Sequence, residues 1–180
     1  MMRALTVFES MYGNTRSVAD SIAGGLGRFF DVSVVPVADA SPSLVNSAVL
    51  LVVGGPTHLH GLSSTTSRKM AREAAEKPGS GLVLEPSAVG EGLRDWLDAI
   101  PRGNGWTAAF DTRIEGSALI TGRASTGIAR RLRRRGYHLA LPPESFLVDK
   151  EGHLLDGELR RATAWGAALG RQLGLQPVAS

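Results

Sequence analysis

The sequence predicts an α/β fold, a doubly wound five-stranded parallel sheet with helices on both faces. Apolar runs typical of strands alternate with helical runs five times along the 180 residues, which is the pattern of a parallel sheet. Residues 48–53 are continuously apolar, as expected of a strand covered on both faces. Polar or glycine-containing loops follow the first, third and fourth strands. Parallel sheets bind ligands at such loops, which favours the strand order 2-1-3-4-5.

The first two strands flank an amphipathic helix. Residues 3–9 are mostly apolar and rich in strand formers, which predicts a strand. Apolar residues then recur every three or four positions, at Val18, Ile22, Leu26 and Phe29. This spacing indicates a helix, which should end near residue 30. Residues 31–37 alternate in polarity and contain Pro36, which is tolerated at a sheet edge.

The middle of the chain is expected to hold two helices around a long loop. We predict a helix over 63–75, a loop rich in glycine and proline over 77–92, and a short amphipathic helix over 92–100. Trp96 lies on the apolar face of the short helix, and we assign it to the core rather than to a ligand. A brief helical stretch near Leu44 precedes the third strand.

The last third of the chain completes the alternation. Residues 106–110 read as the fourth strand, and a helix over 125–135 should end at Gly136. Two short apolar runs, 137–141 and 145–148, form a fifth strand bent by Pro142 and Pro143. The last helix, 157–173, is expected to bury Leu159, Ala162, Gly166, Leu169 and Leu173.

Composition excludes several classes of protein. Hydrophobic residues make up 43% and charged residues 21% of the chain, which is ordinary for a globular protein and argues against disorder. Because there is no cysteine, disulfides, thiolate nucleophiles and iron–sulfur ligation are ruled out. No apolar run approaches the length of a membrane span, and no signal peptide is evident. One domain over 1–180 and a cytoplasmic location are therefore expected.

The positive charge is concentrated in one helix. The net charge is +3, and five arginines lie in the six positions 130–135. These arginines occupy one arc of the helix and Ile128 and Leu132 the other, so we interpret the cluster as a solvated face. A docking patch for an acidic partner is the alternative. Binding of nucleic acid is disfavoured because no aromatic residues are interleaved with the arginines.

The loop after the first strand has the composition of a phosphate-binding site. It contains hydroxyl side chains, an amide and a glycine that allows a sharp turn with exposed N–H groups; the residues are Ser10, Met11, Tyr12, Gly13, Asn14 and Thr15. A phosphate bound there would also meet the positive end of the following helix. The alternative is a simple turn with a capping residue. A single glycine favours a mononucleotide over a dinucleotide.

This loop resembles the phosphate-binding loop of the flavodoxin family, a Ser/Thr-x-Thr/Tyr-Gly-Asn-Thr run that holds the phosphate of FMN. The resemblance continues in the loop after the third strand, where a Gly-x-Pro-Thr sequence packs beside the flavin. The residues that it assigns to cofactor binding there are Pro56, Thr57, His58, Leu59, His60 and Gly61. Many flavodoxins have a tryptophan in this loop, whereas this chain has histidines. We disfavour a metal site at His58 and His60, since no third ligand is evident.

The third flavin loop of the resemblance follows the fourth strand. Flavodoxins often place an aromatic residue there, which points to Phe110, with Asp111, Thr112 and Arg113 near the polar edge of the ring. For Phe110, a place in the core is an equally good interpretation. No residue is assigned a catalytic role.

The resemblance implies an FMN-binding electron carrier that serves redox partner proteins as a monomer or weak homodimer. Two alternatives stay open. One is a small FMN-dependent oxidoreductase that passes electrons from NAD(P)H to a quinone-like acceptor. The other is a binding or regulatory module that has lost FMN. A hydrolase is disfavoured because the Gly-x-Ser-x-Gly elbow is absent.

Overall fold

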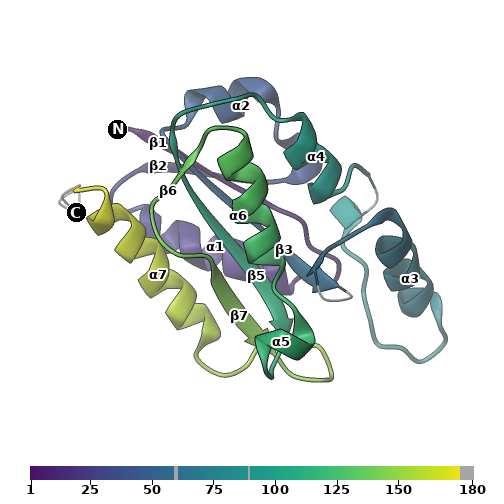
Figure 1. Cartoon of the computed structure of the whole chain (residues 1–180). Coiled ribbons are helices and arrows are strands. Elements are labelled where there is room, and N and C mark those ends of the chain that lie inside the picture. The colour runs from purple at the N-terminus through teal and green to yellow at the C-terminus, as the bar shows by residue number, and fades with distance from the viewer. Residues whose placement is uncertain (59–60, 89, 175–180) are drawn as a thin grey trace.

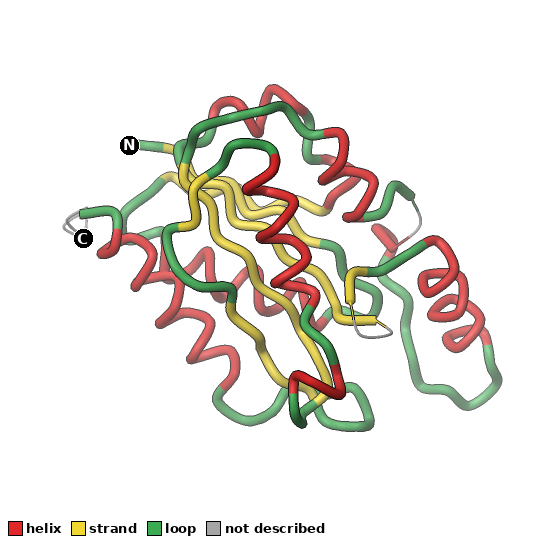
Figure 2. Tube along the Cα trace, in the orientation of Figure 1, coloured by secondary structure: helices red, strands yellow, loops and turns green. Residues whose placement is uncertain are grey.

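A twisted sheet with helices on both sides forms the centre of the molecule (Figures 1 and 2). The structure is a computed structural model, and it describes residues 1–58, 61–88 and 90–174. The strands run in the order β2-β1-β3-β5-β6, with β4 paired to β3 and β7 paired to β5. Their bounds are β1 Arg3–Phe8, β2 Asp31–Pro36, β3 Leu50–His58, β4 Gly61–Leu62, β5 Trp106–Ile114, β6 His138–Leu139 and β7 Glu144–Val148.

The doubly wound parallel sheet that the sequence predicts is confirmed. Every pairing is parallel except that of β4 with β3. The proline-bearing strand β2 lies at the edge of the sheet, as expected. Segments β6 and β7 both lie along β5, one beside Trp106 and the other beside Phe110–Ile114. They are thus two parts of the expected fifth strand, separated by the segment that carries Pro142 and Pro143.

The helices divide between the two faces of the sheet. Helices α1 (Asn14–Leu26) and α7 (Glu158–Gln172) contribute to one apolar cluster, and α2 (Pro42–Ser47), α4 (Leu93–Ala99) and α6 (Ala124–Arg134) contribute to the other (Figure 1). Helix α3 (Thr65–Glu76) lies to one side of the sheet in Figure 1. The short elements are α5 (Ala118–Thr121) and the 3-10 turns η1 (Val37–Asp39) and η2 (Pro86–Ala88).

Glycines bring α1 and α7 into backbone contact. A Cβ atom at Gly166 would lie 2.2 Å from the carbonyl oxygen of Ile22, and one at Gly25 would lie 2.0 Å from that of Thr163. Real Cβ atoms do not approach other atoms this closely, so only glycine fits at either position. The close packing of α1 against α7 therefore requires glycine at positions 25 and 166.

Several boundaries differ from those expected. Strand β3 continues to His58 and β5 to Ile114. Both strands extend beyond the apolar runs that predicted them, toward the ligand-binding end of the sheet. Helix α1 ends at Leu26 and is followed by Gly27, so the expected end near residue 30 was wrong. Leu159 is 43% exposed and does not belong to the buried face of α7.

The arginine cluster is the solvated face of α6. Ile128 and Leu132 are fully buried, whereas Arg130, Arg133 and Arg134 are exposed. A fourth arginine, Arg131, lies 3.4 Å from the carboxylate of Asp98. In the described part of the chain, no helix is long and apolar enough to span a membrane.

Candidate functional site

One cavity of about 200 Å³ lies where the loop after β1 meets the carboxyl ends of β3 and β5. Ten of the sixteen predicted cofactor residues line this cavity: Ser10, Met11, Tyr12, Asn14, Thr15, Pro56, Thr57, His58, Thr112 and Arg113. Gly13, Gly61, Phe110 and Asp111 do not line it. Leu59 and His60 lie outside the described residues. The cavity thus joins residues that lie far apart in the chain, from Ser10 to Gly152.

The start of α1 leaves backbone donors free at this cavity. Gly13 is the N-cap residue, with φ of 97° in the left-handed region, and no side chain caps the helix. The N–H group of Gly13 donates to the Ser10 hydroxyl at 3.1 Å. The first-turn N–H groups of a helix have no carbonyl partner within the helix, and they carry the positive end of its dipole. This geometry suits a bound anion.

Two hydrogen bonds tie the first loop to other loops of the site. The Thr15 hydroxyl lies 2.8 Å from that of Thr112 at the end of β5. The Asn14 amide donates to the carbonyl of Gly152 at 2.5 Å. Gly152 lies in the turn after β7, so three loops are held in a fixed relation around the cavity.

Tyr12 and Met11 face away from the helix start. The Tyr12 hydroxyl donates to the carbonyl of Ala71 in α3 at 2.8 Å. Met11 is 3% exposed and packs against Ala71 and Ala88. These two residues fasten the loop to α3, and the Tyr12 hydroxyl has a partner other than a phosphate.

Two of the predicted flavin contacts are buried in the fold instead. Phe110 is fully buried and packs edge-on against Phe146, with 6.3 Å between ring centroids. Asp111 is also fully buried, and its carboxylate accepts a hydrogen bond of 2.7 Å from the N–H of Ser125 at the start of α6. Residues alternate between the two sides of a strand, so Phe110 points to the core. The structure thus places Phe110 in the core, which was one of its two interpretations, and places Asp111 at the start of α6 rather than in the cavity lining.

Thr57 and Asp111 cap the same helix. The Thr57 hydroxyl accepts a hydrogen bond of 3.0 Å from the N–H of Ala124, the residue before Ser125. Burial raises the pKa of Asp111, although hydrogen bonds from Ser125 and Ser145 and the charge of Arg123 oppose the shift. Side chains thus accept hydrogen bonds from the backbone N–H groups at the start of α6, whereas no side chain caps the start of α1.

His58 and Arg113 are the polar side chains on the outer part of the cavity. The Nε2 atom of His58 is buried and has no hydrogen-bond partner within the described residues, and burial lowers the pKa of this histidine. The Arg113 guanidinium donates to the carbonyl of Gly116 at 2.8 Å and to the Thr121 hydroxyl at 3.0 Å. Among the described residues no group of three histidine or acidic side chains is arranged to hold a metal ion.

Sequence reasoning missed the wall that the last strand contributes. Ile114, Val148 and Gly152 line the cavity. Val148 is the last residue of β7, and ligands bind at the carboxyl ends of parallel strands. Applying that rule to the fifth strand would have drawn attention to the turn after it.

Comparisons with known proteins agree with this geometry. The sequence model of the family described as Flavodoxin matches residues 7–99, just over half of the chain. The chain belongs to the flavodoxin family. The matched range includes the first two loops of the site. No curated protein sequence matches the chain. Family membership makes FMN the cofactor and places the chain among FMN-binding electron-transfer proteins at the level of the family.

Solved structures with similar folds include other members of the flavodoxin family. Flavodoxin 2 from Bacillus cereus is 18% identical, with a TM-score of 0.67, and the match covers 94% of this chain and 99% of that one. A flavodoxin from the domain Archaea is 20% identical, with a TM-score of 0.64 and coverage of 96% and 99%. The flavodoxin, WrbA-like protein from Agrobacterium tumefaciens is 16% identical, with a TM-score of 0.60 and coverage of 98% and 100%.

The residues present fit FMN at the cavity of this flavodoxin-family chain. The uncapped start of α1 suits the phosphate, and the unpartnered Nε2 of His58 suits a polar atom of the ring. One carboxylate, that of Glu85, would repel a phosphate at the start of α1. An oxygen of Glu85 would lie 3.3 Å from a Cβ atom at Gly13, and the other oxygen is 3.3 Å from Arg16. Arg16 therefore offsets part of the negative charge beside the loop.

A second acidic residue, Glu9, is next to the loop in sequence but is buried. Glu9 is 5% exposed and accepts hydrogen bonds from the Ser63 hydroxyl at 2.5 Å and the Leu93 N–H at 3.2 Å. Arg68 lies 3.9 Å from its other oxygen. Burial raises the pKa of Glu9 and outweighs the hydrogen bonds and the Arg68 charge. Glu9 thereby fixes the end of β1 to the chain before α3 and to the start of α4.

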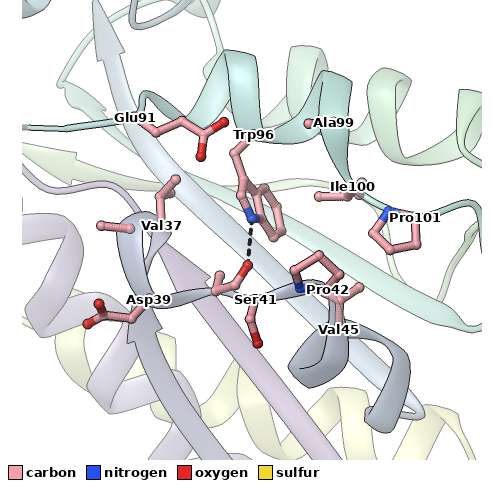
Figure 3. A pocket seen from close by; sticks show the side chains of 12 residues that line it. Val37, Asp39, Ser41, Pro42, Val45, Glu91, Trp96, Ala99, Ile100 and Pro101 are labelled. Atoms are coloured by element: carbon pink, nitrogen blue, oxygen red, sulfur yellow. Dashed lines mark hydrogen bonds between the residues drawn. The ribbon is translucent and has the colours of Figure 1, made fainter.

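A separate cavity of about 290 Å³ lies between η1, α2 and α4 (Figure 3). Trp96 forms one wall, and its indole N–H donates to the carbonyl of Ala40 at 3.0 Å. Trp96 is 5% exposed, which confirms that it belongs to the core. Asp39 and Glu91 lie at the edge of this cavity in Figure 3. The FMN cavity contains none of these residues.

Proposed function

We propose that residues 1–180 form one FMN-binding unit whose function is to carry electrons between redox partner proteins. The observation that supports this most is the uncapped start of α1 at a cavity that three ligand loops share. In this proposal the backbone N–H groups of Asn14 and Thr15 and the hydroxyls of Ser10 and Thr15 bind the phosphate. Pro56, Thr57 and His58 lie beside the ring, with Thr112 and Arg113 opposite. FMN supplies the electron chemistry when it is bound.

The protein's own part is to bind and orient the cofactor. The Thr15–Thr112 and Asn14–Gly152 hydrogen bonds hold the loops in place before a ligand arrives, which reduces the ordering cost of binding. The Arg113 charge beside the ring favours negative charge on it.

A titration of the purified protein with FMN, followed by quenching of flavin fluorescence, tests the proposal. We expect saturable one-to-one binding that is lost in Asn14→Asp/Thr15→Ala, because this variant places a negative charge in the cradle and removes a hydroxyl. Asn46→Asp/Thr126→Ala is the matched control, because it makes the same two changes at exposed positions of α2 and α6. Its FMN affinity should stay within about twofold of the wild type. A protein that ignores FMN would instead favour the binding module.

One observation favours a reductase as a second candidate. A cavity of about 350 Å³ is lined by Arg113, Arg123 and Arg161 and shares Arg113 with the FMN cavity. Glu144 and Glu158 lie in the same cavity and bind Arg161. Arg113 and Arg123 donate to carbonyl and hydroxyl oxygens instead, so their positive charges can attract an anionic nucleotide. Stopped-flow mixing of the FMN-loaded protein with NADPH discriminates the two functions. Reduction at a rate that supports turnover, slowed in Arg123→Gln, would replace the pure carrier by a reductase.

A further inference from the structure

His58 presents an unpartnered nitrogen at the FMN cavity. It is the last residue of β3 and pairs with Gly61 of β4. The residue lines the cavity, and its buried Nε2 atom has no hydrogen-bond partner within the described residues. Buried polar atoms almost always have a partner, and an unpartnered one calls for an explanation. A ligand in the cavity would provide that partner.

Within the described residues, Arg113 is the one charged side chain that lines the cavity together with His58. On β5, Arg113 lines the same cavity, whereas the Asp111 carboxylate is buried and bonded to Ser125. On β1, which pairs with β3, the Glu9 carboxylate is bonded to Ser63 and Leu93. Other charged groups near these elements have protein partners: Arg123 at the start of α6 bonds Ser145 and Pro143, and Arg68 of α3 bonds Gly90. The titratable Tyr12 on the first loop bonds Ala71.

In this environment His58 is neutral at neutral pH. Burial removes water from the ring and lowers the pKa of His58, because the charged form loses its hydration. A negative charge that enters the cavity would act in the opposite direction and raise the affinity of the imidazole for a proton.

We propose that His58 hydrogen-bonds the ring of bound FMN and takes up one proton from solvent when the ring gains one electron. This inference rests on the proposed function. One electron arrives from the reductant, one proton binds Nε2 to give the imidazolium, and reoxidation by the acceptor returns the proton to solvent. No other bond of the protein forms or breaks. His58 thereby couples electron transfer to proton uptake.

NMR of the histidine ring protons, recorded from pH 5 to 9 on the FMN-loaded protein, tests the proton uptake directly. His58→Gln identifies the signal of His58. With FMN oxidised, the pKa should be low, and after reduction with dithionite it should rise by at least one unit, about a tenfold gain in proton affinity. The exposed His138 is the internal reference, and its signals should be the same in both redox states.

Potentiometric titration gives an independent readout. Between the two pKa values of His58, the first one-electron potential of the wild type should fall with pH more steeply than that of His58→Gln. The difference should reach about 59 mV per pH unit, the value for one proton bound per electron. His58→Phe should behave as His58→Gln, and the surface control His138→Gln as the wild type.

The outcomes separate this inference from the proposed function. If FMN binds and the pKa of His58 is the same in both redox states, or if His58→Gln keeps the wild-type pH slope, the coupling is refuted while the carrier stands. If FMN does not bind the wild-type protein, both proposals fall. A redox-dependent pKa together with the loss of the additional slope in both His58 variants supports the coupling.

Discussion

The hydroxyls of Thr15 and Thr112 lie 2.8 Å apart and join the first turn of α1 to the end of β5. Both residues are buried, and 97 positions of sequence separate them. We therefore expect Thr112→Val to lose about 0.5–1.5 kcal/mol of stability. The Kd for FMN should rise by about three- to tenfold, because the loop is no longer held in place.

Isothermal titration with FMN and urea unfolding measure these two effects. The matched control is Thr126→Val, since Thr126 is exposed on α6. It should change neither quantity by more than about 0.5 kcal/mol. Wild-type affinity in Thr112→Val would show that this hydrogen bond does not organise the site.

Removing the charge of Glu85 should strengthen FMN binding. Its carboxylate lies beside Gly13 and pairs with Arg16, so Glu85→Gln both removes a repulsive charge and releases Arg16 toward the phosphate. We expect a roughly threefold lower Kd at low ionic strength, and the gain should shrink in 1 M salt.

Glu73→Gln is the charge-matched control for this change. Glu73 is exposed on α3 and pairs with Lys69. Fluorescence titrations at two salt concentrations should show no gain for Glu73→Gln. An equal gain in both variants would point to net charge rather than to the position of Glu85.

The buried Glu9 carboxyl should make stability depend on pH. Its pKa in the folded protein is above the usual value, so between the unfolded and folded pKa values the folded state binds more protons. The free energy of unfolding therefore falls as pH rises through this interval. Glu9→Gln, which resembles the protonated acid, should match the wild type near pH 4.5 and be the more stable of the two at pH 8.

Urea unfolding at several pH values tests this difference. Asp111 also has a raised pKa, so the variant keeps part of the pH dependence, and only the difference between the two proteins reports on Glu9. Glu76→Gln, at an exposed position of α3, should follow the wild type throughout. A constant difference between Glu9→Gln and the wild type would contradict the assignment.

The contact between α1 and α7 predicts opposite effects for two glycine substitutions. Gly166→Ala should destabilise the fold by about 1–3 kcal/mol, because the new Cβ would meet the carbonyl of Ile22 at 2.2 Å. Gly24→Ala, in α1, places its Cβ in open space. It should add about 0.5–1 kcal/mol through helix propensity. Thermal unfolding of both variants measures the two changes in stability. Similar changes in the two variants would argue against close packing of α1 and α7.

The order of the strands and the first loop could be predicted from sequence because both rest on local patterns. The apolar run 48–53 and the alternation of strand and helix determine the sheet, and Gly13 with its polar neighbours marks the loop. Pro142 and Pro143 marked the interruption between β6 and β7, since proline cannot donate to a ladder.

The rest of the site depends on contacts that no local pattern reveals. Tyr12 bonds α3, 59 positions away, and Asp111 caps α6; neither role follows from residue type. Phe110 could not be assigned because the side of a strand that faces a ligand is known only once register and neighbours are fixed. Gly152 lies in the turn after β7, and the sequence of this turn matches no binding motif used in the prediction.

Four consecutive residues of β5 have four different roles, since Phe110 fills the core, Asp111 caps α6, Thr112 holds the first loop and Arg113 lines the cavity. Phe110 pairs with Gly54, where a Cβ would lie 2.1 Å from its ring. A shift of one residue between these strands would turn the Phe110 ring to the other face of the sheet, away from Gly54. A misaligned chain would then not hold FMN, so the yellow colour that stays with the protein after free FMN is removed by gel filtration can serve as a visual assay of correct strand alignment in libraries of β5 variants.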